Sequence, residues 1–421
     1  MRGRHFLTIG AAAGMLWGQG LPARAVEVIP LYRISLTGGQ YFFASDKSNL
    51  NANIKATAAP AVKLDEEWTL LPLYNGNFRG TKSVNDTVGS GTLFQQGMDH
   101  YLSFAGLYKP EDSTWRFKPA VNYKLEFLKE TRDETWGKGL FDYQTVGVEL
   151  AAENVYKEPF SYRLGYEFFY TFYPNYQSLE SQAGIDPNGN RLNRENAGTD
   201  VLDTINNALN ASISIPVPYD EPKVALNLGY RAAWQRYPDQ PIIAQDGEPN
   251  DHKPYNRQDF YNSLTVGVTY PRSLMADALR MNLGFHTGVS HNGSNQNTYD
   301  AGKTRFISDS YGYYSVPVGV ALGLAWGDKK NPSTADLGCT WIRQQYLGRL
   351  AQDENGTYLD GERQRQDRFV LGLGYGYPIA PNFRLTAQAS VARATSNTKF
   401  EQSYRYTYTA ATYLLGFTYD Y

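Results

Sequence analysis

The chain has 421 residues, with 40 Lys and Arg against 42 Asp and Glu, five His, one Cys, 33 Tyr, 20 Phe and seven Trp. This balance lacks the basic surplus that nucleic-acid-binding proteins carry. A single cysteine excludes an internal disulfide framework, a c-type haem attachment motif and a zinc site made of thiolates. We therefore expect no nucleic-acid partner, no cofactor and no metal centre.

The first 25 residues predict a secretory signal peptide. A basic start over residues 1–5 precedes a mainly apolar run over 6–18 and the small-residue site Ala23-Arg-Ala25. The apolar run is too short to cross a bilayer as a helix, and the layout is typical of a cleaved export signal. We expect cleavage after Ala25, which leaves residues 26–421 as one exported domain.

Several later segments alternate between two kinds of side chain, as in the stretch from Tyr162 to Phe172. One face carries Tyr162, Leu164, Tyr166, Phe168, Tyr170 and Phe172, and the other carries Arg163, Gly165, Glu167, Phe169 and Thr171. Residues 115–127 and 314–326 follow the same period of two, which a helix would not. Sandwich strands usually run for about five or six residues, whereas a transmembrane strand needs about 9–11. The length therefore favours strands that cross a membrane.

Taken in chain order, the alternation predicts about sixteen strands. They are 31–43, 52–64, 67–77, 99–109, 114–128, 140–153, 160–173, 203–215, 223–236, 259–270, 279–291, 310–326, 336–350, 367–377, 383–395 and 405–421. The first three and 336–350 alternate least cleanly, and the sequence is compatible with 14 to 18 strands. An even number places both ends of the chain on one side of a bacterial barrel.

The connections between these strands alternate between short and long. Short ones rich in turn residues are 109–113, 216–222, 328–333 and 378–382, and long polar ones are 78–98, 129–139, 174–202, 237–258, 292–309, 351–366 and 396–404. Short periplasmic turns and longer external loops are typical of transmembrane barrels. The longest loop, at 174–202, is the candidate for folding inward as a constriction, with an exposed loop as the alternative.

The end of the chain has the clearest two-faced pattern. One face of this last strand carries Tyr413, Leu415, Phe417, Tyr419 and Tyr421. We expect residues 405–421 to pair antiparallel with residues near 31–43 and this face to contact lipid. A charged residue at Phe417 or Tyr421 is then expected to impair assembly more than it alters solute preference.

Together, the export signal, the alternating strands and the aromatic last strand resemble the bacterial outer-membrane β-barrel proteins, of the porin-like type, across residues 26–421. The resemblance implies an all-β fold: a single antiparallel up-and-down transmembrane β-barrel in the outer membrane of a Gram-negative bacterium. It also implies that the last strand, from Tyr413 to Tyr421, is part of the signal read by the barrel-assembly machinery. Family members most often end in Phe or Trp, whereas this chain ends in Tyr421.

Charged side chains gather on the strand face opposite the aromatic one. We expect this charged face to line the lumen. These candidate lumen residues are Arg116, Lys118, Lys124, Glu126, Arg163, Glu167, Arg231, Arg280, Arg368 and Arg384. The simpler interpretation is that they pair with one another in a wet interior. The sharper one is an electropositive channel, because rings of Arg and Lys select anions.

The chemistry-bearing motifs of the sequence are weak. Ser290 and His291 are adjacent and so point to opposite faces of a strand, which prevents them from pairing as nucleophile and base. The stretches 186–190 and 353–362 resemble calcium loops only superficially, and turn chemistry explains both. We therefore expect no enzyme activity.

The leading hypothesis is a water-filled pore for passive diffusion of small solutes selected by size and charge, since about sixteen strands leave an aqueous passage. The alternative is an export or assembly barrel for polysaccharide, lipoprotein or protein that works with a separate periplasmic partner. A third hypothesis is a surface-loop adhesin, for which loss of loop 174–202 would abolish attachment but not permeability. Outer-membrane lipid is a partner in every case.

Overall fold

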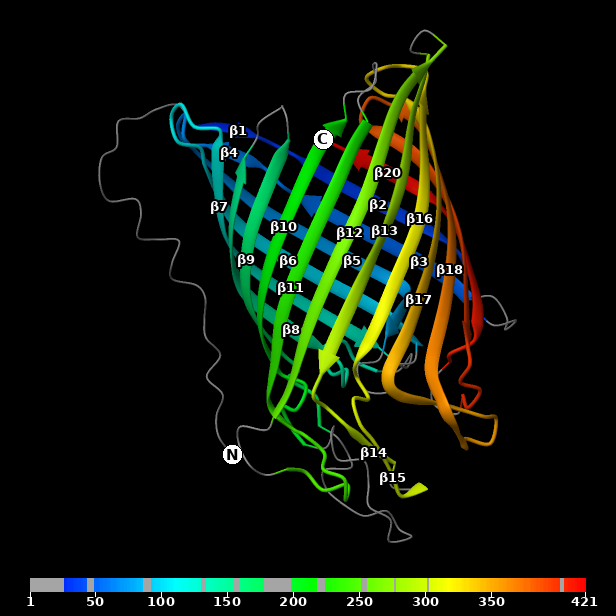
Figure 1. The fold of residues 1–421 in the computed structure, drawn as a ribbon. Coiled ribbons are helices and arrows are strands. Elements are labelled where there is room, and N and C mark those ends of the chain that lie inside the picture. The colour runs from blue at the N-terminus through cyan, green and yellow to red at the C-terminus, as the bar shows by residue number, and fades with distance from the viewer. Residues whose placement is uncertain are drawn as a thin grey trace.

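The protein is described by a computed structural model (Figure 1). It describes residues 26–43, 49–85, 92–129, 134–154, 160–177, 198–217, 224–250, 256–275, 278–300, 303–401 and 405–421, with the backbone alone at 49, 81–85 and 92–95. The expected signal peptide over 1–25 lies outside the described residues.

The wall of the molecule is one antiparallel β-sheet that closes on itself as a barrel of sixteen strands, as the alternation predicts. The barrel strands are β2 (Tyr32–Phe43), β3 (Asn49–Ala58), β5 (Trp68–Asn85), β6 (Thr92–Tyr108), β7 (Trp115–Lys129), β8 (Tyr143–Asn154), β9 (Ser161–Phe172), β10 (Thr204–Val217), β11 (Val224–Pro241), β12 (Asn256–Leu274), β13 (Leu279–Ser294), β16 (Tyr313–Trp326), β17 (Ser333–Gln352), β18 (Tyr358–Ala380), β19 (Phe383–Ser396) and β20 (Tyr408–Asp420). Two short strands, β1 (Glu27–Ile29) and β4 (Ala61–Lys63), pair beside β5, and β14 (Thr298–Asp300) pairs with β15 (Arg305–Ile307) in a loop.

The barrel closes where β20 pairs antiparallel with β2, which confirms the expected pairing of the last strand with the first. The register runs from Arg33 opposite Asp420 to Phe43 opposite Ala410. Tyr32 and Tyr421 exchange backbone hydrogen bonds of 2.9 and 2.8 Å at the end of this seam. In Figure 1 the red β20 lies beside the blue β2.

The two seam strands approach each other closely at two glycines. A Cβ added to Gly39 would lie 1.8 Å from the carbonyl oxygen of Tyr413, and one added to Gly416 would lie 1.9 Å from that of Leu36. No side chain fits at such distances, so glycine is required at both positions for the strands to pair as they do.

The wall has two chemically different faces because successive side chains of a strand point to opposite sides of a sheet. On β8, Val146, Val148 and Leu150 lie on one face, and Leu150 is 59% exposed. The ladder continues this face into Phe168 and Tyr166 of β9. We call it the apolar face, and the opposite one, which carries the charged residues treated below, the polar face.

Several expected loops are wrong because strands continue through them. Strands β5 and β6 run to Asn85 and from Thr92, so most of the loop expected at 78–98 is a hairpin. Strands β17 and β18 likewise extend to Gln352 and from Tyr358, into the loop expected at 351–366. Over residues 358–366 of β18 both faces carry polar side chains, so the alternation has ended there although the ladder continues. The 336–350 segment is a strand despite its irregular pattern.

The two ends of the barrel differ. Short turns, including 381–382 between β18 and β19, lie at the end that holds Tyr421, and β14 and β15 lie at the other, which we call the loop end (Figure 1). At the loop end, the buried guanidinium of Arg257 lies between two tyrosine rings. Its central carbon is 4.2 Å from the ring centre of Tyr237 and 4.0 Å from that of Tyr311. Within the described ranges, no helix is long and apolar enough to cross a membrane.

Candidate functional site: the polar face of the barrel

All ten charged residues selected from the sequence lie on the polar face. The cross-strand register from β7 to β19 carries one face continuously around the wall, and each of the ten falls on it. They are Arg116, Lys118, Lys124 and Glu126 on β7, Arg163 and Glu167 on β9, Arg231 on β11, Arg280 on β13, Arg368 on β18 and Arg384 on β19. The alternation thus assigned a common face to residues on six strands.

A row of ion pairs crosses the wall from β7 to β9. Lys118 Nζ lies 2.7 Å from Glu153 Oε1, and Arg163 Nη2 lies 2.6 Å from Glu149 Oε1. A further pair near the loop end joins Lys124 Nζ to Glu126 Oε2 at 2.7 Å. Alternating charges of this kind neutralise each other across neighbouring strands.

The side-chain amide of Asn210 links a fourth ion pair, between Glu167 of β9 and Arg231 of β11. Glu167 lies 3.0 Å from Arg231 Nη2, and it also accepts a hydrogen bond of 2.8 Å from the side-chain nitrogen of Asn210. The oxygen of Asn210 in turn accepts a bond of 2.8 Å from Arg231 Nη1. These three residues hold one another, and with the neighbouring Gly165 and Ser212 they line a cavity of about 280 Å³.

The ion pairs remain accessible to solvent. The side chains of Arg163, Lys118 and Arg231 are 48, 31 and 35% exposed, although each contacts a carboxylate. A barrel interior filled by side chains would bury such groups. These charged groups are therefore accessible to solvent although they are paired.

The other four selected residues are all arginines that have no carboxylate within ion-pair distance in the described part of the chain. Arg116, Arg280 and Arg368 belong to this set, and so does Arg384, which donates a hydrogen bond of 3.3 Å to the carbonyl of Pro332. The ten residues therefore divide into mutually paired charges and a cationic remainder. Mutual pairing holds for six of the ten, and anion selection by the other four stays a prediction.

Three partners were missed by the sequence analysis: Glu149 and Glu153 on β8, and Asn210 on β10. The period-two pattern of 143–154 places both glutamates opposite Val148 and Leu150, so the same signal could have found them. Which arginine or lysine each one contacts depends on the register between strands, which the alternation does not encode.

The remaining motifs behave as ordinary strand and turn residues where they are described. His291 stacks on Tyr314 on the apolar face, with ring centres 4.5 Å apart, whereas Ser290 lies on the polar face. Asp353 accepts hydrogen bonds from the backbone nitrogens of Asn355 and Thr357 at 2.9 and 2.8 Å, which confirms turn chemistry there. No cluster of three or more His, Cys, Asp or Glu suited to a metal occurs among the residues searched, which are those described. The absence of enzyme activity stays a prediction.

The proposed constriction loop is only partly described. Tyr176, Val201 and Leu202 pack together with Phe141 and Tyr173 at the base of this loop. Residues 178–197, which include the stretch 186–190, lie outside the described residues. An inward constriction stays a prediction.

The five aromatic and apolar residues expected at the end of the chain share the apolar face. Leu415 is 71% exposed, whereas the adjacent Leu414 is 5% exposed on the opposite face. Phe417 stacks on Phe383 of β19 at 5.3 Å between ring centres, and Tyr413 contacts Phe42 of β2. Their role as an assembly signal stays a prediction.

In the water-filled pore expected from the sequence, removing the carboxylate of Glu167 should raise the preference for anions over cations. In Glu167→Gln the Arg231 cation keeps Asn210 but loses its counter-charge. A unit charge at about 4 Å is worth about 1 kcal/mol in water, and salt screens part of this, so we expect the anion-over-cation permeability ratio to rise about two- to threefold. Reversal potentials in a salt gradient measure the ratio. Glu111→Gln, in an exposed turn, is the control; an equal rise in both variants would contradict a local effect.

Comparison with known proteins gives structural likeness only. No protein-family model matches the sequence, and no curated protein matches it. Among solved structures, the chain is similar to a bacterial polysaccharide outer membrane secretin, with 8% identity over 93% of this chain and 98% of that one and a TM-score of 0.44. OmpT of Vibrio cholerae has 9% identity over 95 and 99% with a TM-score of 0.41, and OccD3 (OpdP) of Pseudomonas aeruginosa has 8% over 93 and 91% with 0.45.

The closed antiparallel barrel with an apolar face carries the architectural conclusion. The chain has the fold of an outer-membrane β-barrel. The resemblance drawn from the sequence is thereby confirmed at the level of fold.

Proposed function

We propose that the protein is an outer-membrane pore whose water-filled lumen conducts small polar solutes, with a preference for anions. In this proposal the polar face lines the lumen and the apolar face contacts lipid. The observation that carries it is the solvent exposure of paired charges such as Arg163 and Arg231, because hydrated ion pairs on an inner wall require an aqueous space.

The preference for anions rests on the cationic remainder of the wall. Arg116, Arg280 and Arg368 have no carboxylate partner in the described part of the chain, whereas Glu149, Glu153 and Glu167 each contact a cation. Unpaired guanidinium groups attract anions and fix them through forked hydrogen bonds. Selectivity then comes from lumen charge and diameter, and no covalent step is involved.

The location follows from the same proposal. A chain with an apolar outer wall and hydrated interior belongs in a bilayer, and single-chain barrels of this kind occupy bacterial outer membranes. Residues 1–25 would direct export through a cleaved signal peptide, and the barrel-assembly machinery would insert residues 26–421.

Planar-bilayer recording of refolded residues 26–421 tests the proposal. We expect discrete conductance steps. In a salt gradient, the sign of the reversal potential should show that anions permeate more readily than cations. A folded protein that gives no channel events would overturn the open pore. Co-purification of a periplasmic partner with such a silent barrel would favour the export or assembly alternative instead.

A further inference from the structure

A group of arginines lies on the apolar face, where charges are not expected. Arg343 of β17, Arg365 of β18 and Arg393 of β19 occupy this face together with Asp367. We call these four residues the arginine patch. It holds three cations and one carboxylate, so its net charge is positive.

The patch lies beside and just beyond the aromatic side chains of β17 and β18, with Arg393 opposite Phe369. Along β17 and β18, Trp341 and Phe369 are cross-strand neighbours on the apolar face, and Arg343 and Asp367 form the next pair toward the loop end. The guanidinium of Arg343 lies 5.2 Å from the ring centre of Trp341. Tryptophan is typical of the membrane–water interface, so the patch lies at the level of lipid headgroups if the apolar face contacts lipid as proposed above.

The internal geometry of the patch leaves cation surface free for a ligand. Asp367 accepts a hydrogen bond of 2.8 Å from Arg343 Nε and lies 3.5 Å from Arg365 Nε. The two arginine side chains are nevertheless 46 and 48% exposed. Arg393 is exposed as well, and it has no carboxylate within ion-pair distance in the described ranges. One carboxylate thus positions two guanidinium groups without saturating them.

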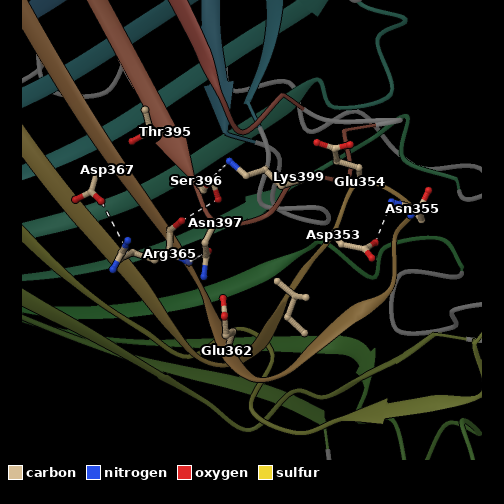
Figure 2. Close-up of a pocket in the computed structure, with 11 residues that line it drawn as sticks. Asp353, Glu354, Asn355, Glu362, Arg365, Asp367, Thr395, Ser396, Asn397 and Lys399 are labelled. Carbon is tan, nitrogen blue, oxygen red and sulfur yellow. Dashed lines mark hydrogen bonds and ion pairs between the residues drawn. The ribbon is translucent and has the colours of Figure 1, made fainter.

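A cavity of about 730 Å³ adjoins the patch on its loop-end side (Figure 2). Its lining includes Arg365, Asn355, Glu362, Thr395, Asn397 and Lys399. The wall is fixed: Asn397 accepts a bond of 2.8 Å from the backbone nitrogen of Arg365, and Ser396 Oγ donates one of 2.8 Å to the carbonyl of Arg365. Hydroxyl, amide and carboxylate groups in one hollow suit the hydroxyl groups of a sugar.

From this arrangement we infer that the patch and its cavity bind the headgroup of a phosphorylated glycolipid in the outer leaflet. The phosphate would contact Arg343 and Arg393, since guanidinium groups bind phosphate through paired hydrogen bonds. The saccharide would enter the cavity, and the acyl chains would follow the apolar face past Phe369 and Leu373. A free phosphate would use the arginines but neither the cavity nor the apolar face.

Native mass spectrometry of the detergent-solubilised full chain with diphosphoryl lipid A as the probe tests this inference. We expect binding to wild type and about tenfold weaker binding to the double variant R343Q/R393Q, because each arginine supplies a charge-assisted contact. R343K/R393K is expected to recover part of the affinity, since lysine keeps the charge but not the fork. Heat-modifiable gel mobility identifies folded protein in every sample.

The matched control is R236Q/R272Q, which removes two other exposed arginines of the apolar face. Arg236 lies 5.5 Å from the ring centre of Trp234, much as Arg343 lies near Trp341. Absence of lipid binding by wild type, or an equal loss in this control, would overturn the site. Displacement of the lipid by equimolar inorganic phosphate would overturn the lipid as its occupant. The conductance of R343Q/R393Q separates this result from the pore proposal, because the patch lies outside the lumen face.

Discussion

Replacing Gly39 or Gly416 with alanine is expected to prevent proper closure of the barrel. The added Cβ would lie 1.8 or 1.9 Å from a backbone oxygen of the partner strand, so β2 and β20 would have to separate and lose ladder hydrogen bonds. Overpacking costs about 1–3 kcal/mol, and each lost hydrogen bond costs about 0.5–1.5 kcal/mol. We expect either variant to lose about 2–4 kcal/mol of unfolding free energy and most of its folded yield.

The fraction of protein that keeps the mobility of a folded barrel in unheated gels measures this effect. Gly338→Ala and Gly372→Ala are matched controls, because nothing lies within 4 Å of a Cβ built at either position on β17 or β18. These controls should fold like wild type. If Gly39→Ala and Gly416→Ala folded equally well, the seam would not have the close approach described above.

Placing an arginine on the apolar face is expected to destabilise the protein far more than placing one on the polar face. Leu373 and Gly372 are adjacent on β18 and so point to opposite sides of the wall. Leu373 is 52% exposed between the rings of Phe369 and Tyr375 on the same face, which puts it near the middle of the apolar band. Leu373→Arg should lose about 2–4 kcal/mol, the cost of an arginine at the bilayer midplane.

Gly372→Arg introduces the same charge into open space on the polar face, and we expect its unfolding free energy to stay within about 1 kcal/mol of wild type. Denaturant titration of both variants in phosphatidylcholine vesicles gives the comparison. Equal losses would mean that lipid does not contact the apolar face. That outcome would remove the membrane location on which the glycolipid site rests, while leaving the closed fold intact.

The sequence predicted the strands that have one apolar face and one polar face. Strands such as 160–173 and 310–326 alternate because one face meets an apolar phase, and the structure has them as β9 and β16. Where both faces are polar, as over residues 360–366 of β18, the pattern ends but the ladder continues. The expected start of this strand at 367 was wrong for that reason.

The candidate site was predictable in its composition but not in its pairing. Alternation alone assigned Arg163, Glu167 and Arg231 to one face. It could not indicate that Glu167 reaches across β10 to Arg231, because that contact depends on how far neighbouring strands are staggered. The arginine patch was missed for a related reason: Arg343 and Asp367 are 24 positions apart and meet only through strand register.

The pairing of β2 with β20 means that the barrel cannot close until β20 has been synthesised. Arg33 and Asp420 are 387 positions apart in sequence, yet they form an ion pair. Because β20 is made after every other strand of the barrel, β2 lacks its closing partner until β20 has been synthesised. A chain truncated before β20 would retain a long unpaired edge on β2, and such edges promote aggregation.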